Sequence, residues 1–240
     1  FLSFGCLKKN KGLGVKPENR KYFGVYKRRV SIKEIKSIRK QYKGNLQIVA
    51  WPIDWAKKFP VKTCVNIIQQ KAIPFILWNP VIKDYPEAAG FEAILRDDWL
   101  EYLEEWAEDV KEYQYPVFIC FAPDFNNNER DWFIKDKQGS EKMKAVYKKI
   151  VMIFKEKEVE NAIWVFSPSF ESSPGLDWQI VEKAYPGDKY IDWLGFSALV
   201  NNNLDDKGDN KLSSLICNSI ENIQKISSKK PIVVSCLGVA

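Results

Sequence analysis

Histidine is absent from this 240-residue chain. Its absence excludes the Ser-His-Asp and Cys-His arrangements that activate a nucleophile. The five cysteines show neither a CxxC pair nor another metal-ligand spacing, so a zinc site would lack its usual ligands. Any acid or base chemistry must therefore come from carboxylates, Tyr, Lys or Cys. We expect no metal and no cofactor.

Long apolar runs are also missing. No stretch of about 18 apolar residues occurs, so the sequence predicts no transmembrane helix. A hydrophobic fraction of 45% and an aromatic fraction of 14% are enough for the full core of a single α/β domain.

Positive charge is concentrated near the start of the chain. The net charge is +6, and much of the excess lies before residue 45, at Lys8, Lys9, Lys11, Lys16, Arg20, Lys21, Lys27, Arg28 and Arg29. A segment of this kind is usually solvated, although it can bind nucleic acid or anionic lipid. The basic residues are not interleaved with aromatics on a recognisable module, which argues against nucleic acid as a partner.

The first ten residues, FLSFGCLKKN, resemble the end of a secretory signal that reaches a cysteine. This resemblance predicts a polar and basic leader over residues 1–20 and an exported protein, extracellular or in the cell envelope. It also predicts a lipid anchor at Cys6. The remainder, residues 21–240, is predicted to form one domain.

Apolar runs and helical patterns alternate along that domain. We predict strands over residues 21–26, 46–51, 73–78, 117–121, 162–166, 191–196 and 231–234. Capping pairs, Ser31 with Glu34 and Asp98 with Glu101, predict the starts of two intervening helices. The alternation fits a doubly wound sheet or a (β/α)8 barrel of the TIM type. The barrel is favoured because nearly every strand ends in Trp, Pro, Asn or Asp, as at a functional rim. The eighth strand would then lie beyond Ala240.

Residues 115–132, YPVFICFAPDFNNNERDW, carry the strongest functional signal. An apolar strand over residues 117–121 runs into Asp124 and three asparagines. A buried strand that ends in a carboxylate and amides is how a barrel presents chemistry at its C-terminal face, although an exposed turn would have the same composition.

Aromatic residues also gather at the predicted strand ends. Trp51, Trp55, Trp78 and Trp132 could stack on sugar rings there or could be packed under loops, and Tyr85, Phe125 and Phe170 could add to such a platform. Trp99, Trp106, Trp164 and Trp193 fall inside predicted elements and are interpreted as core.

Several of these stretches together resemble glycoside hydrolase family 26, the β-mannanase family. The matching segments are PVFICFAPDFNNN with RDWF, IPFILWNP, NAIWVFSP, YPGDKYIDWLG and KPIVVSCLG. The resemblance covers most of the chain from about Tyr22. It implies a (β/α)8 barrel and retaining cleavage of β-linked polysaccharides, usually mannans, by two carboxyl groups about 5 Å apart.

The chain departs from that family at the catalytic positions. The acid/base glutamate falls on Asp124, the histidine before it on Pro123, and the nucleophilic glutamate on Cys236, while the motif asparagine is kept as Asn126. Aspartate is one methylene shorter than glutamate, and misplacing a catalytic group by about 1 Å can cost about 100-fold in rate. Glu171, Glu129 or Asp131 could supply a second carboxylate for an inverting reaction.

We therefore expect a degenerate glycosidase-like domain, a pseudoenzyme that binds β-linked polysaccharide through Trp51, Trp55, Trp78, Asn126, Trp132 and Glu171. The first alternative is an active mannan-type endo-hydrolase that uses Asp124 as general acid/base. The second is an envelope-assembly protein that uses the barrel as a docking surface. The oligomeric state, the sugar and the linkage stay open.

Overall fold

The computed structural model describes residues 22–170, 172–200 and 208–239. The predictions for Cys6, for the leader and for Glu171 lie outside these ranges. Within them, no helix is both long enough and apolar enough to cross a lipid bilayer.

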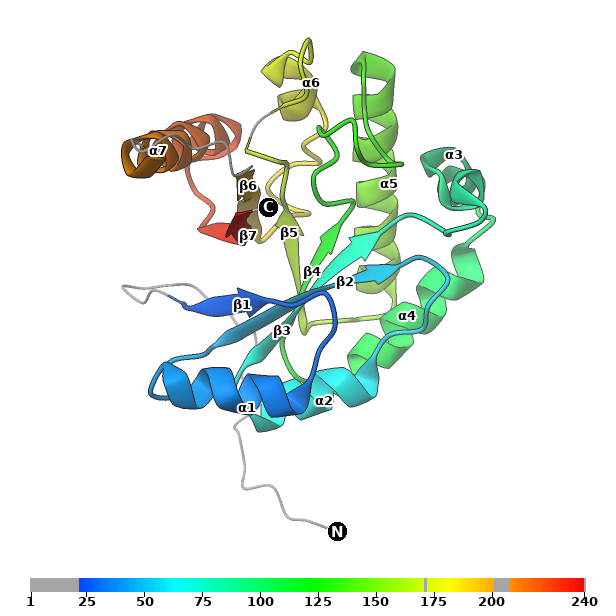
Figure 1. Cartoon of the computed structure of the whole chain (residues 1–240). Helices are drawn as coiled ribbons and strands as arrows, with labels where there is room; N and C mark the ends of the chain where they lie inside the picture. Colours follow the sequence, from blue (N-terminus) through cyan, green and yellow to red (C-terminus); the bar gives the residue numbers. More distant parts are fainter. Residues whose placement is uncertain (1–21, 171, 201–207, 240) are drawn as a thin grey trace.

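Seven parallel strands form a single sheet in sequence order, β1 to β7, that curls into a nearly closed barrel (Figure 1). The strands are β1 (Gly24–Tyr26), β2 (Ile48–Asp54), β3 (Ile73–Asn79), β4 (Val117–Phe121), β5 (Ala162–Phe166), β6 (Trp193–Val200) and β7 (Ile232–Val239). In the described part of the chain, β1 pairs only with β2 and β7 only with β6. This arrangement is the (β/α)8-type barrel with one strand missing, as predicted.

Helices cover the outside of the sheet (Figure 1). They are α1 (Ile32–Gln41), α2 (Val61–Gln69), the 3₁₀ turn η1 (Pro86–Ala89), α3 (Phe91–Leu95), α4 (Leu100–Tyr113), α5 (Lys137–Glu156), α6 (Trp178–Lys183) and α7 (Gly208–Ile226). The prediction for the first helix is confirmed at its start, because Ser31 Oγ accepts a hydrogen bond from the Glu34 amide at 3.4 Å.

The Asp98–Glu101 capping prediction is wrong. Trp99 is the N-cap residue of α4 and provides no side-chain cap. The Asp98 carboxylate instead accepts from Arg96 at 2.7 Å. On the same helix, Leu103 and Trp106 are buried, whereas Leu100 is 38% exposed.

The position of β4 in the barrel explains why its sequence is apolar throughout and does not alternate between apolar and polar residues. Phe118 and Cys120 point into the barrel and pack with residues of the other strands, while Val117, Ile119 and Phe121 pack against the helices. All five side chains are buried, because a parallel strand in a barrel has no face toward water. The carboxyl ends of the strands therefore form one rim, and the polar loop after β4 lies on it.

Candidate functional site

The loop after β4 is a series of tight turns. The amides of Asn127, Arg130 and Phe133 donate to the carbonyls of Asp124, Asn127 and Arg130, respectively. Asp124 has φ 57°, a left-handed conformation that Asp tolerates better than most residues. Its amide donates to the Ser167 carbonyl at 3.0 Å, which fixes the loop to the end of β5. The turns thus hold Asp124 over the barrel mouth.

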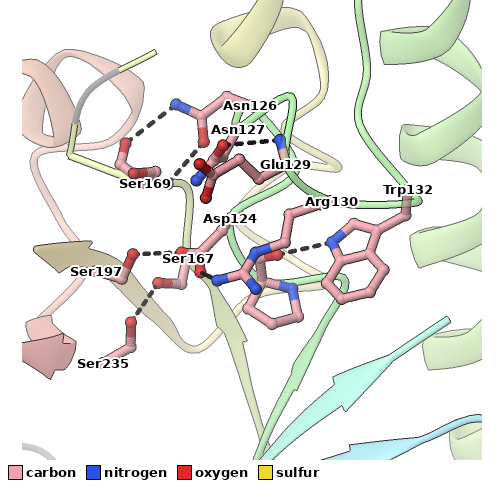
Figure 2. Close-up of polar contacts among 11 residues, drawn as sticks. Asp124, Asn126, Asn127, Glu129, Arg130, Trp132, Ser167, Ser169, Ser197 and Ser235 are labelled. Carbon is pink, nitrogen blue, oxygen red and sulfur yellow. Dashed lines mark hydrogen bonds and ion pairs between the residues drawn. The ribbon is translucent and has the colours of Figure 1, made fainter. Parts of the chain in front are cut away.

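Both carboxylate oxygens of Asp124 accept hydrogen bonds from protein groups (Figure 2). Arg130 Nη2 donates to Oδ2 at 2.5 Å, and Ser197 Oγ donates to Oδ1. Asp124 is 6% exposed, whereas the Arg130 side chain is 33% exposed. Charge-assisted hydrogen bonds of this kind are about twice as strong as neutral ones. The carboxylate is therefore held inside the protein and does not present a free oxygen.

A pair of serines lies beside this carboxylate. Ser167, at the end of β5, and Ser235, on β7, share a hydrogen bond of 2.8 Å between their hydroxyl oxygens. Ser235 is the extra residue of a β-bulge, because Phe196 pairs with Val234 and the next residue, Ser197, pairs with Cys236. Bulges often redirect a side chain next to a site. Here the bulge places the Ser235 hydroxyl against Ser167, while the Ser197 hydroxyl donates to Asp124.

Cys236 follows the bulge and is partly buried. The pKa of its thiol is raised to about 11, chiefly by burial and next by the Asp124 carboxylate, against the lowering effect of Arg130. Tyr26 lies at the end of β1. Burial raises the pKa of its phenol most, and Cys236 raises it next, whereas Arg28 and Arg130 lower it. These mutual effects place the phenol, the thiol, the guanidinium and the carboxylate in one neighbourhood.

The raised pKa predicts that Cys236 is a slow nucleophile at neutral pH. With a pKa of about 11, about one thiol in 10,000 is ionised at pH 7, and only the thiolate attacks. We expect alkylation of Cys236 by iodoacetamide to accelerate about tenfold per pH unit from pH 7 to pH 10. Quantitative peptide mass spectrometry measures this rate, with the exposed Cys217 as an internal reference. Fast alkylation at pH 7 would contradict the expectation.

Asn126 ties two rim loops together. Its Oδ1 accepts from the Ser169 amide at 2.6 Å, and its Nδ2 donates to the Ser169 carbonyl at 3.0 Å (Figure 2). The same Nδ2 donates to Ser172 Oγ at 3.2 Å. The side chain is fully buried. Its amide is thus occupied by the loop after β5, and contact with a sugar stays a prediction.

The four candidate rim tryptophans are all buried, at 5% for Trp51, 2% for Trp55, 0% for Trp78 and 9% for Trp132. Trp78 stacks between Trp55 and Trp106, with ring centroids at 4.8 and 3.9 Å. Trp132 Nε1 donates to the Pro123 carbonyl at 2.7 Å, and Arg130 lies over its ring at 5.9 Å. Trp55 and Trp78 therefore belong to the core in this structure, and a sugar-stacking role for Trp51 and Trp132 stays a prediction.

The remaining rim candidates differ in exposure. Phe125 is fully buried and Phe170 partly buried, whereas Tyr85, in the loop between β3 and η1, is 71% exposed. Glu129 and Asp131 are exposed acids in the loop of Asp124. Tyr85 is thus the candidate aromatic with a free ring face.

Several residues of the site were missed at the sequence level: Tyr26, Arg130, Ser167, Ser197 and Ser235. Two of them, Tyr26 and Ser167, stand at or just past strand ends, so the rule that located Asp124 could also have marked them, whereas Ser197 and Ser235 lie within β6 and β7. Serine was overlooked because it is common in turns. No local signal marks Arg130, because its partner is defined only by how the loop folds.

A (β/α) barrel with a carboxylate and hydroxyls at its C-terminal rim is one of the architectures on which glycoside hydrolases are built. The model of glycosyl hydrolase family 26 matches residues 58–226, which is more than half of the chain. The chain belongs to this family, as its sequence motifs suggested.

Solved structures of the family share the fold. The modular endo-β-1,4-mannanase of Cellulomonas fimi superposes with a TM-score of 0.62 at 13% identity, covering 80% of this chain and 49% of that one. The family 26 domain of an endo-β-mannanase/endo-β-glucanase from Prevotella bryantii gives 0.60 at 11%, covering 90% and 83%. A family 26 β-mannanase from Bacteroides ovatus gives 0.57 at 17%, covering 80% of this chain. The chain spans 62% of the length of that last enzyme.

Proposed function

We propose that this domain binds a β-linked, mannan-type polysaccharide at its barrel rim without retaining hydrolysis. The observation that carries the proposal is the state of the two catalytic positions. Asp124 has both carboxylate oxygens engaged by Arg130 and Ser197, and Cys236 carries a thiol whose pKa is raised to about 11.

Retaining cleavage needs one carboxyl group that gives a proton to the leaving oxygen and a second that attacks the sugar. Arg130 and Ser197 donate to the two Asp124 oxygens, and the side chain is buried, so it is not turned outward toward a leaving oxygen. A neutral thiol at the other position is a poor nucleophile. Both halves of the reaction are thus impaired, whereas the rim that surrounds them persists.

Binding can rest on groups that remain open to solvent. The Tyr85 ring is 71% exposed, and Tyr26 is 36% exposed next to Arg130 and Cys236. Exposed rings bind the apolar face of a sugar, and phenol and guanidinium groups donate to its hydroxyls. A polysaccharide ligand implies an exported protein. The solved relatives described as mannanases support the choice of mannan.

Titration calorimetry with manno-oligosaccharides tests the proposal, with gluco- and xylo-oligosaccharides for comparison. We expect measurable binding and no release of reducing sugar. Tyr85→Ala should weaken binding about tenfold, because it removes the exposed ring. Tyr42→Ala is the matched control, since Tyr42 is 44% exposed but follows α1 at the opposite end of the barrel.

Other results would replace the proposal. Absence of heat with every oligosaccharide would remove the binding function and favour a protein-docking role, to be seen as a persistent partner in pull-downs. Release of reducing sugar that vanishes in Asp124→Asn would establish the alternative, an active hydrolase with Asp124 as general acid/base.

A further inference from the structure

Positive charge gathers at the end of the barrel opposite the candidate site. Helix α1 ends at Gln41 and α2 at Gln69, and each leads into the start of a strand, so both helix ends lie at the N-terminal edge of the sheet (Figure 1). A shallow, open surface depression of about 330 Å³ lies between these ends. It is lined by Lys36, Arg39, Lys40, Lys43, Gly44 and Gln70. We call these six residues, together with Phe23 and Tyr42, the basic face.

The charge on the basic face is not neutralised locally. The lining of the depression includes four cations, Lys36, Arg39, Lys40 and Lys43, and no acid. Lys36, Lys40 and Lys43 are exposed, and in the part of the chain that the structure describes they belong to no ion pair. Their combined field therefore reaches into solvent over about a Debye length.

Two exposed aromatic rings border these lysines. Phe23 is 39% exposed and Tyr42 is 44% exposed, and their ring centroids lie 4.7 Å apart. Tyr42 directly precedes Lys43. An exposed Phe–Tyr pair beside flexible lysines has the composition of a surface that enters the headgroup region of a bilayer.

We propose that the basic face docks on an anionic lipid surface. The type of cation favours lipid over nucleic acid. The one arginine of the basic face, Arg39, donates through Nη1 to the carbonyls of Leu46 and Gln70, so one arm of its guanidinium is held by the backbone. The remaining cations are lysines, which act as hydrated point charges and suit a fluid layer of headgroups.

The position of the basic face sets the orientation. Lys36, Arg39, Lys40 and Lys43 lie at the N-terminal end of the barrel, whereas Asp124, Glu129 and Asp131 lie in the loop at the opposite rim. An anionic surface attracts the basic face. Docking in this orientation turns the rim with Asp124 away from the lipid, where a polysaccharide can reach it.

Co-sedimentation of the full chain with vesicles tests the docking. We expect binding to phosphatidylcholine vesicles that contain about 30% phosphatidylglycerol, and no binding to pure phosphatidylcholine. Each lysine near such a surface strengthens partitioning about fivefold, so Lys36→Gln/Lys40→Gln/Lys43→Gln should weaken it about 100-fold. Binding should also fall steeply between about 0.05 M and 0.5 M salt.

The matched control removes the same charge from the rim side, as Lys83→Gln/Lys135→Gln/Lys137→Gln. These lysines are exposed and lie in or next to the loops after β3 and β4. Equal binding by the two triple variants would place the contact elsewhere on the chain and overturn the proposal. No vesicle binding by the wild-type chain at low salt, or binding of duplex DNA in its place, would also overturn it.

Discussion

Asp124→Ala should lower the free energy of unfolding by about 3 kcal/mol. The substitution removes two hydrogen bonds to a charged group, each of which contributes about 1.5–3 kcal/mol. It also leaves Arg130 without its carboxylate. Because the Arg130 side chain is 33% exposed, water replaces part of that interaction, and the loss stays at the lower end of the range for a broken buried pair. Urea denaturation measures the effect.

Controls separate the ion pair from other consequences of the substitution. Asp131→Ala removes an exposed acid from the same loop and should change stability by no more than about 0.5 kcal/mol. Asp124→Asn keeps the shape and the tolerance for a positive φ, so about 1–2 kcal/mol should be lost. In a double-mutant cycle, Asp124→Ala and Arg130→Ala should show a coupling energy of about 1.5–3 kcal/mol.

This prediction bears on the function as well as on stability. An acid/base residue that only awaits substrate could be replaced with little effect on folding, and such residues often reduce stability. If Asp124→Ala left the unfolding free energy unchanged, the contacts with Arg130 and Ser197 would carry little energy. The carboxylate would then be free to turn toward a substrate, which would strengthen the hydrolase alternative.

The strands could be predicted because burial on two faces leaves a direct mark in the sequence. The run over residues 117–121 contains only apolar side chains, and the structure buries all five. Helix starts were less predictable. Ser31 caps α1 as expected, but α4 begins one residue later than the cap at Asp98 requires, with Trp99 as its N-cap, and the Asp98 carboxylate accepts from Arg96. The spacing of a capping pair in the sequence does not show at which residue the helix begins or which other group binds the carboxylate.

The site could be predicted only in part, because residues that contact one another there are far apart in the sequence. Asp124 was located by its place after β4, but Ser197 lies 73 residues further on and meets it only when β6 closes beside β5. The bulge at Ser235 likewise depends on how β7 pairs with β6. Contacts of this kind are set by register, and apolar periodicity alone does not reveal register.

Trp78 shows the corresponding limit for aromatic residues. At the sequence level, a tryptophan near the end of a strand fits a sugar platform and a packed core equally well. The structure buries Trp78 because rings from two other segments cover both of its faces, Trp55 after β2 and Trp106 from α4. Its Nε1 donates to Tyr102 at 3.2 Å, so its polar atom is satisfied inside the protein as well.

Trp78→Ala should therefore be among the most destabilising substitutions in the chain, with a loss of about 3–5 kcal/mol in the free energy of unfolding. The loss combines the lost burial of the indole, the two broken ring contacts and a cavity that Trp55 and Trp106 cannot fill without moving. Trp78→Phe keeps an aromatic ring in the stack and should recover about half of the loss. Thermal and urea denaturation of both variants measure the difference.

Tyr85→Ala is the matched aromatic control, because Tyr85 lies seven positions further along the same rim but is 71% exposed. It should leave stability within about 0.5 kcal/mol of wild type and act on polysaccharide affinity alone. The opposite pattern, in which Trp78→Ala folds normally but loses affinity, would mean that the indole stack opens to admit a sugar. The buried arrangement would then be the resting form of the platform that the sequence predicted, and Trp78 would return to the list of binding residues.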